Sequence, residues 1–219
     1  MLNVYRRLDH PALLLGIVEV RKGTVGSASP GLQAQAASVA RRILAPGYEI
    51  PEDARGAVRT MLKYGGFSPT GRNRPAQELL VRDVQERGAF HHINNVVDVN
   101  NLISLETLLP ISIFDADKIG GDIDVRLGEP GESYVFNASG HVLDVKRLVV
   151  CARHDGGPIG SPVKDSAETK VFEGARWFVG VMYAPAALLS AEALRDSLHR
   201  FATLLAGETG GEIVQERIA

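Results

Sequence analysis

The densest group of polar side chains in the sequence lies at residues 91–101, where two adjacent histidines precede four asparagines and one aspartate. Neighbouring side chains rarely converge on one metal ion, and the His-x-x-x-His and Cys-x-x-Cys spacings of metal sites are absent. Asparagines bond their own backbone in turns and helix caps. At the start of an apolar helix they also suit the wall of a polar pocket, where unpaired N–H groups attract carboxylates or phosphates. Both interpretations stay open, and no metal is expected.

Two carboxylates stand two residues apart at Asp115 and Asp117, directly before Lys118. In a strand they would share one face, as a general acid/base pair or a divalent-cation site requires. Alternatively, one aspartate caps a turn and the other pairs with Lys118 or with an arginine. The second interpretation is favoured, so these residues are expected to hold the architecture.

Arg72 and Arg74 flank Asn73 just before a predicted helix. Two guanidinium groups so placed can bind a phosphate bidentately, or they are simply solvated; the sequence leaves both open. No Gly-x-Gly-x-x-Gly, Gly-x-Ser-x-Gly or phosphate-loop motif is present, which disfavours the common nucleotide-binding and hydrolase folds. No cofactor is therefore expected.

The elements that must position these side chains follow from apolar spacing and from turn residues. Helices are predicted at residues 32–45, 51–64, 75–88 and 98–109, and from the cap Ser190 through Leu205. Strands are predicted at residues 13–20, 111–114, 134–137, 142–145, 148–152 and 177–183, with an edge strand at 212–216. Helices at both ends of a strand-rich middle predict an α+β fold and not regular βαβ units.

Composition narrows the class of protein. The chain has 219 residues, 45% of them hydrophobic and 23% charged, which is typical of one globular domain. A net charge of −2 does not indicate general electrostatic binding of nucleic acid. No apolar run is long enough for a membrane helix. The single cysteine, Cys151, fits a reducing compartment and is more simply a buried thiol than a nucleophile. We therefore expect a cytoplasmic protein without a membrane partner.

Three motifs follow one another in the middle of the chain. They are Arg74-Pro75-x-x-Glu78-Leu79-Leu80-x-Arg82, Asn94-x-Val96-Val97-Asp98-x-Asn100-Asn101-x-x-Ser104-Leu105 and Pro110-x-x-x-Phe114-Asp115-x-Asp117-Lys118-Ile119-x-Gly121. In this order they resemble the third and fourth domains, the tRNA-editing domain, of the bacterial phenylalanyl-tRNA synthetase β subunit. The resemblance covers roughly residues 72–183, and the first 70 residues look like the leader of stand-alone members of the family.

The resemblance implies a sheet-rich α+β core, layered or barrel-like, with helices packed outside it. It also implies a pocket that receives the amino acid of a mischarged tRNA and hydrolyses its ester. Asn100 and Asn101 fall at positions that line this pocket in the family. The Thr169 segment is similar to another part of the pocket, and Arg72 and Arg74 would contact the tRNA.

Three positions depart from the family pattern. Ser112 stands where the family has a pocket histidine, Val181 stands where it has the glutamate that selects the tyrosine hydroxyl, and Ala175 replaces a threonine. A buried hydroxyl is selected by a buried polar partner, so tyrosine is expected to lose its advantage in this pocket.

These observations lead to one functional expectation. Residues 1–219 form a single editing-like domain, with a leader at 1–70 and the core at 71–219, that recognises and can hydrolyse a misacylated tRNA in trans. Asn101 and Ser112 are the candidate catalytic residues. The candidate substrate-binding residues are Asn100, Asn101, Ser112, Thr169 and Val181. One alternative is a module without catalysis that binds an amino acid, an aminoacylated tRNA end or a protein. Another is a hydrolase of an unrelated small molecule that uses Asp115 and Asp117.

Overall fold

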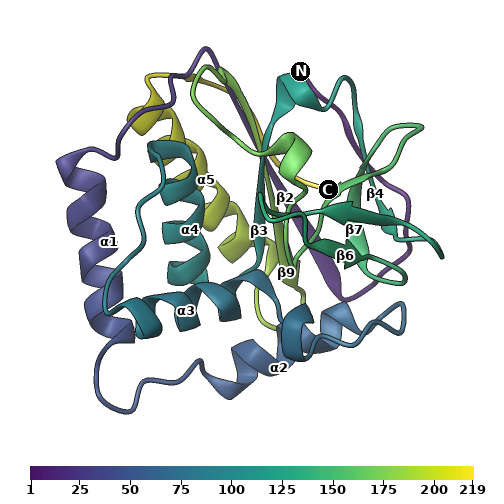
Figure 1. Cartoon of the computed structure of the whole chain (residues 1–219), viewed down its shortest axis with the longest axis horizontal. Coiled ribbons are helices and arrows are strands. Elements are labelled where there is room, and N and C mark those ends of the chain that lie inside the picture. The colour runs from purple at the N-terminus through teal and green to yellow at the C-terminus, as the bar shows by residue number, and fades with distance from the viewer.

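Two four-stranded sheets and a set of helices make up the fold in three layers (Figure 1). The computed structural model describes all 219 residues. The first sheet has the order β10-β2-β9-β3, with strands Glu212–Ile218, Leu13–Arg21, Trp177–Pro185 and Ile111–Asp115. The second sheet has the order β1-β4-β7-β8, with strands Val4–Arg6, Ile123–Leu127, Val149–Arg153 and Pro158–Gly160. A hairpin of β5 (Ser133–Val135) and β6 (Val142–Asp144) lies beside the second sheet.

The first sheet is buried on both of its faces. Side chains alternate along a strand, so Val18 and Val20 of β2 enter the core beneath the helices, while Leu15 and Ile17 enter the core shared with the second sheet. This explains why β2 reads as a nearly continuous apolar run and not as an alternating one.

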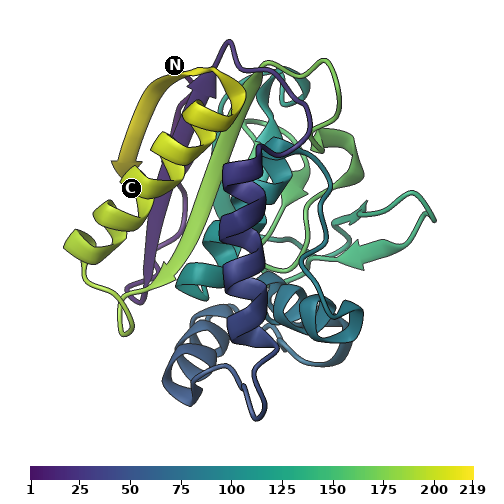
Figure 2. The same ribbon diagram turned by 90° about the vertical axis from the view of Figure 1, so that its left-hand side faces the viewer.

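Five helices surround the sheets. They are α1 (Pro30–Ile43), α2 (Glu52–Leu62), α3 (Ala76–Arg87), α4 (Asn95–Thr107) and α5 (Ala191–Thr209). Figures 1 and 2 show α1, α4 and α5 on one face of the first sheet, with α3 crossing below α4. The helix α2 packs Val58 and Met61 into the core between the two sheets.

Side-chain caps fix where three helices begin. The side chain of Ser29 accepts a hydrogen bond from Leu32 N, Asn94 accepts one from Val97 N, and Ser190 accepts one from Ala193 N. Each cap satisfies a backbone N–H that has no partner within its helix. The cap at Asn94 starts α4 at Asn95, three residues before the start that the apolar spacing predicts.

The predicted α+β class is confirmed, and its sheet-rich core is layered. Each predicted helix and strand is present with small shifts at its ends, and β10 lies at an edge of its sheet, where it pairs with β2 alone. Three strands were not predicted, namely β1, β4 and β8, two of them only three residues long. Within the expected leader, β2 is an inner strand of the first sheet, between β10 and β9. None of the helices combines the length and the apolar character that crossing a bilayer requires.

Candidate functional site

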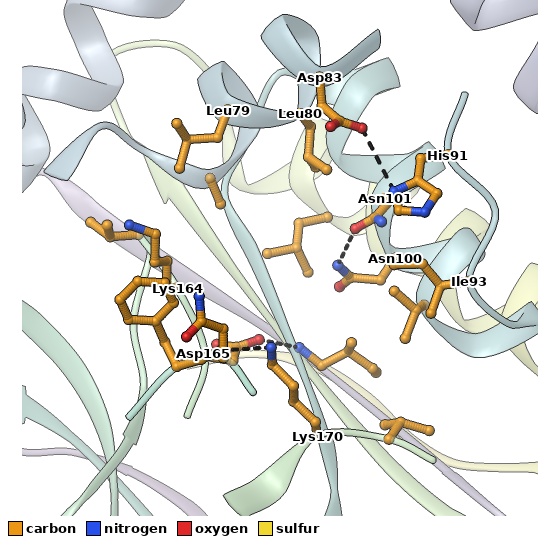
Figure 3. A pocket seen from close by; sticks show the side chains of 18 of the residues that line it. Leu79, Leu80, Asp83, His91, Ile93, Asn100, Asn101, Lys164, Asp165 and Lys170 are labelled. Carbon is orange, nitrogen blue, oxygen red and sulfur yellow. Dashed lines mark hydrogen bonds and ion pairs between the residues drawn. The ribbon is translucent and has the colours of Figure 1, made fainter. Parts of the chain in front are cut away.

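A cavity of about 730 Å³ opens between α3, α4, β3 and the segments that precede β9 (Figure 3). Most of its lining is apolar, and α3, α4 and β3 contribute Leu79, Leu80, Leu105, Ile111 and Ile113 to it. Cavities of this size and character, with a few polar groups, are typical of small-ligand sites. The polar groups that face this cavity therefore decide its chemistry.

The α4 wall carries Asn100 and Asn101, which the sequence also predicts for a pocket. Asp98, one turn earlier, fixes the start of this helix by accepting hydrogen bonds from Ile93 N at 2.7 Å and from His92 Nδ1 at 2.7 Å. Asn100 Nδ2 donates to Asn101 Oδ1 at 3.3 Å, whereas the buried Asn100 Oδ1 has no hydrogen-bond partner. The cavity thus receives one free amide acceptor from α4.

Asp165 enters the same cavity from the loop between β8 and the short 3-10 helix Ala167–Thr169 (Figure 3). Its Oδ2 accepts a hydrogen bond from Ile113 N at 3.2 Å, and its Oδ1 is buried without a partner. Burial raises the pKa of this carboxyl to about 7, against the opposing effect of the Ser112 hydroxyl and of Ile113 N–H. A carboxyl that titrates near neutral pH inside a cavity is a candidate general base or cation ligand.

Two lysines border the cavity near this carboxylate. Lys170 Nζ donates to Phe136 O at 2.6 Å, and Figure 3 shows its chain extending toward Asp165. Lys164 Nζ donates to Arg72 O at 2.9 Å and lies 4.4 Å from the centroid of the Phe136 ring. Burial lowers the pKa of Lys164, and the nearby Arg72 charge adds to this. The cavity therefore combines an acidic group with a positively charged border.

Comparison with known proteins places this site within a family. The B3/4 domain family matches residues 66–187, which is more than half of the chain. This chain belongs to the B3/4 domain family. Every residue that lines the cavity lies within the matched segment.

The B3/4 domain is similar to part of several bacterial phenylalanine–tRNA ligase β subunits. The β subunit of Bordetella pertussis is 33% identical over 106 residues, which are 44% of this chain and 13% of the relative. That of Neisseria gonorrhoeae is 32% identical over 101 residues, or 42% and 13% of the two chains. That of Bartonella quintana is 42% identical over 59 residues, or 26% and 7%. The chain thus spans only a small part of the length of these relatives.

A solved structure shares the fold of the whole chain. It is an N-terminal fragment of the phenylalanyl-tRNA synthetase β subunit from Pyrococcus horikoshii, with a TM-score of 0.51 and 13% sequence identity. The match covers 100% of this chain and 54% of that chain. At this identity the similarity concerns the fold, including the strands and helices outside residues 66–187.

Ser112, expected in the pocket of this B3/4 domain, lies behind the cavity wall. Strand alternation turns Ile111 and Ile113 to the cavity and Ser112 to the other face of β3. Its hydroxyl contacts Tyr183 Oη at 3.2 Å and donates to Ser161 O at 3.4 Å. Ser112 therefore does not meet Asn101 inside the cavity. From the other face of β3, its hydroxyl favours the ionised form of Asp165.

Val181 and Thr169 are also outside the lining of the cavity. Val181 pairs directly with Ser112 in the sheet, so it shares that face and is fully buried between the two sheets. The Thr169 hydroxyl donates to Ile159 O at 3.2 Å and is likewise fully buried. Of the predicted substrate-binding residues, the structure brings Asn100 and Asn101 together in the cavity and places the other three in its surroundings.

The predicted tRNA-binding arginines lie before α3. Arg72 is exposed and Arg74 is half-buried, and neither side chain has a hydrogen bond or an ion pair. The contact between Lys164 and Arg72 O brings this segment to the side of the cavity. Both guanidinium groups are thus unpaired within the chain.

The other polar candidates have local partners. Asp115 Oδ2 lies 3.0 Å from Lys118 Nζ, whereas its buried Oδ1 has no hydrogen-bond partner and its side chain caps no turn. His92 pairs with Asp98, and His91 lies 3.9 Å from Asp83. No group of three side chains that bind metals comes together anywhere in the chain.

Asp165, Lys164 and Lys170 are the polar residues that sequence reasoning missed. No motif marks Asp165, which stands among short apolar and polar residues in a loop. Its partner Ile113 is 52 residues away in the chain, so only the packing of the loop on β3 reveals that its carboxylate is buried.

Proposed function

We propose that this B3/4 domain recognises the aminoacyl group of a misacylated tRNA in trans, in the cytoplasm, and hydrolyses its ester. The observation that carries the proposal is the buried carboxylate of Asp165, which enters an apolar cavity beside the amides of Asn100 and Asn101. The same segment is the part of the chain that is similar to phenylalanine–tRNA ligase β subunits.

Ester hydrolysis needs a base that activates water and donors that hold the carbonyl group. Burial raises the pKa of Asp165 to about 7, so its ionised form is accessible near neutral pH and can accept a proton from water. The amide groups of Asn100 and Asn101 are placed to orient the ester. Ser112 acts through Asp165 as a positioning residue, since its hydroxyl favours the ionised carboxylate.

The border of the cavity suits the nucleotide end of such a substrate. Arg72, Arg74 and Lys164 lie together on one side of it and are candidates for the phosphates of the acceptor end. A few local charges on a chain with a net charge of −2 predict a small footprint on the tRNA.

One observation favours a second candidate function, the binding of an aminoacylated end without hydrolysis. The two residues predicted to act in catalysis, Asn101 and Ser112, do not converge, because Ser112 faces the opposite side of β3. In this case Asp165 serves only to bind the substrate, and no group in the cavity activates water.

Deacylation rates of the purified protein on tyrosyl-, phenylalanyl- and alanyl-tRNA decide between the two functions. We expect hydrolysis without a preference for tyrosine, because the buried Val181 offers no partner to a phenolic hydroxyl. Asn101→Ala is expected to lower the rate by about one to two orders of magnitude, as loss of a positioning donor does. The control is Asp83→Asn, at the same cavity but in an exposed ion pair with Arg87.

Two results would change this assignment. A strong preference for tyrosine would show that a polar group other than residue 181 recognises the phenol. Binding of charged tRNA without any deacylation would select the non-catalytic module.

A further inference from the structure

Two buried oxygen atoms at the cavity lack a hydrogen-bond donor. They are Asn100 Oδ1 and Asp165 Oδ1, which belong to different walls of the same cavity (Figure 3). Asn100 is only 5% exposed, and Asp165 Oδ2 accepts a hydrogen bond from Ile113 N at 3.2 Å, while the Ser112 hydroxyl also favours the ionised carboxylate. Buried acceptors are almost always paired in native proteins. Because both oxygen atoms lack a hydrogen-bond donor, a ligand that fits this cavity must supply donors to them.

We propose that the cavity selects amino acids and their esters or amides by a free, protonated α-amino group, which Asp165 and Asn100 bind. An ammonium group has three N–H donors and a positive charge, so it can satisfy both acceptors and neutralise the carboxylate. An N-acylated amino acid has lost the charge and keeps one donor, so it leaves at least one acceptor unpaired.

None of the charged side chains around the cavity pairs with Asp165 in place of the ligand's ammonium group. Lys170 Nζ is bonded to Phe136 O and Lys164 Nζ is bonded to Arg72 O, and neither forms an ion pair with Asp165. On the α3 side, His91 lies beside Asp83, which pairs with Arg87. The Asp165 carboxylate thus has no ion-pair partner; the charge of Lys170 favours its ionised form, but burial outweighs this and raises its pKa to about 7.

The remaining lining indicates the side chain of the ligand. Leu79, Leu80, Ile111 and Ile113 offer an apolar wall next to the two acceptors. An apolar side chain placed there removes its surface from water without leaving a polar group unpaired. We therefore infer an unblocked amino acid derivative with an apolar side chain, as opposed to a peptidyl or N-formyl derivative.

This inference rests on the proposed function for the nature of the complete substrate, but it is testable without tRNA. The probes are L-phenylalaninamide and N-acetyl-L-phenylalaninamide. They differ only at the amino group, and neither contains an ester that the protein could hydrolyse. Calorimetric titration near pH 7 is expected to show saturable binding of the free amine and binding of the N-acetyl compound at least about tenfold weaker, since a hydrogen bond to a charged group is lost.

Substitutions at the cavity test which residues recognise the amino group. Asp165→Asn is expected to weaken binding of L-phenylalaninamide at least about tenfold and to leave the N-acetyl compound nearly unchanged. Asn100→Leu should act in the same direction with a smaller loss, and it provides a second test if the first variant is poorly folded. Asp83→Asn, at the same cavity, should stay within about twofold of the wild type.

Equal affinity for the two amides, or no saturable binding of either by the folded wild type, would overturn the inference. A loss of affinity in Asp83→Asn equal to that in Asp165→Asn would do the same, because it would show a general charge effect. These outcomes are separate from the deacylation assay, which can succeed or fail whichever amide is preferred.

Discussion

Glu19 on β2 is fully buried and Asp165 beside the cavity is half-buried with a buried Oδ1, and the surroundings of the two carboxylates are opposite. Glu19 accepts four hydrogen bonds, from Leu2 N at 3.0 Å, Gln215 Nε2 at 2.7 Å, Arg21 Nε at 2.8 Å and Trp177 Nε1 at 3.0 Å. Asp165 accepts one, from Ile113 N at 3.2 Å, and its second oxygen is unpaired. The first carboxylate joins the two ends of the chain to β2, whereas the second has capacity left for a ligand.

The pKa values follow the same contrast. Burial works against the ionised form of Glu19, but the hydrogen bonds from Leu2, Arg21 and Gln215 outweigh it and lower the pKa of this carboxyl. For Asp165 burial is the largest influence and raises the pKa to about 7. Removing a buried charge from its partners is strongly destabilising, whereas a buried charge that lacks partners itself lowers stability and is typical of functional sites.

The largest expected effect comes from a third carboxylate placed where no partner exists. Val181→Glu puts the family's acidic residue into the fully buried core between the sheets. We expect a loss of about 3–5 kcal/mol in the free energy of unfolding, or failure to fold, because an unpaired charge is desolvated. Urea denaturation measures this, with Val181→Thr as the milder control. A stable variant that prefers tyrosyl-tRNA would show that position 181 reaches the cavity.

The second largest effect on the free energy of unfolding is expected when Glu19, the fully paired carboxylate, is removed. Glu19→Ala leaves Leu2 N buried without an acceptor, removes one of the two acceptors of Gln215 Nε2 and removes the partner of the half-buried Trp177 Nε1, so we expect a loss of about 3–5 kcal/mol. Because the folded-state pKa of Glu19 is lowered, its contribution is present above the ordinary pKa of a glutamate and is lost as the pH falls below it. Denaturant midpoints from pH 7 down to 3 test this. The matched control is Glu212→Ala, whose pair with Lys22 is exposed.

At the cavity we expect the free energy of unfolding to rise and not to fall. Asp165→Asn removes a buried charge that lacks partners, so it should raise the free energy of unfolding by about 1–3 kcal/mol at pH 8. A raised folded-state pKa means that the wild type loses stability as the pH rises from the ordinary range of an aspartate toward 7. The gain in the variant should therefore vanish near pH 4.

Thermal unfolding of both proteins across this range gives the measurement. Lys164, Lys170, Asp83 and His91 border the cavity in both proteins, so the difference between the two curves isolates Asp165. A variant less stable than the wild type at pH 8 would mean that Asp165 holds the loop in place and has no capacity left for a ligand.

The smallest effect is expected at Asp115, a buried carboxylate at the end of β3 that pairs with Lys118. The Lys118 side chain is 37% exposed, so it is solvated when the pair is removed, and asparagine keeps the shape of the side chain without a buried charge. Asp115→Asn should lower the free energy of unfolding by less than about 1 kcal/mol and leave deacylation unchanged. A large loss of activity with intact stability would place Asp115 in the site.

The sequence by itself determined the elements whose causes are local. Asn94 and Ser190 are cap residues that stand directly before an apolar helix, and β2 is a continuous apolar run. The presence of Asn100 and Asn101 at the cavity also follows from their place on α4, because helical spacing sets their direction relative to Val97. The short strands β1 and β8 have too few residues to show a pattern.

Only the tertiary structure decided which groups meet in the cavity. Ser112 and Val181 are turned away from it by the pairing of β3 with β9, which fixes the face of both residues at once. Asp165 is brought beside Ile113 from 52 residues away, and burial there changes its pKa. A cap or an apolar run acts within one turn or strand, whereas the desolvation of a carboxylate depends on all the elements packed around it.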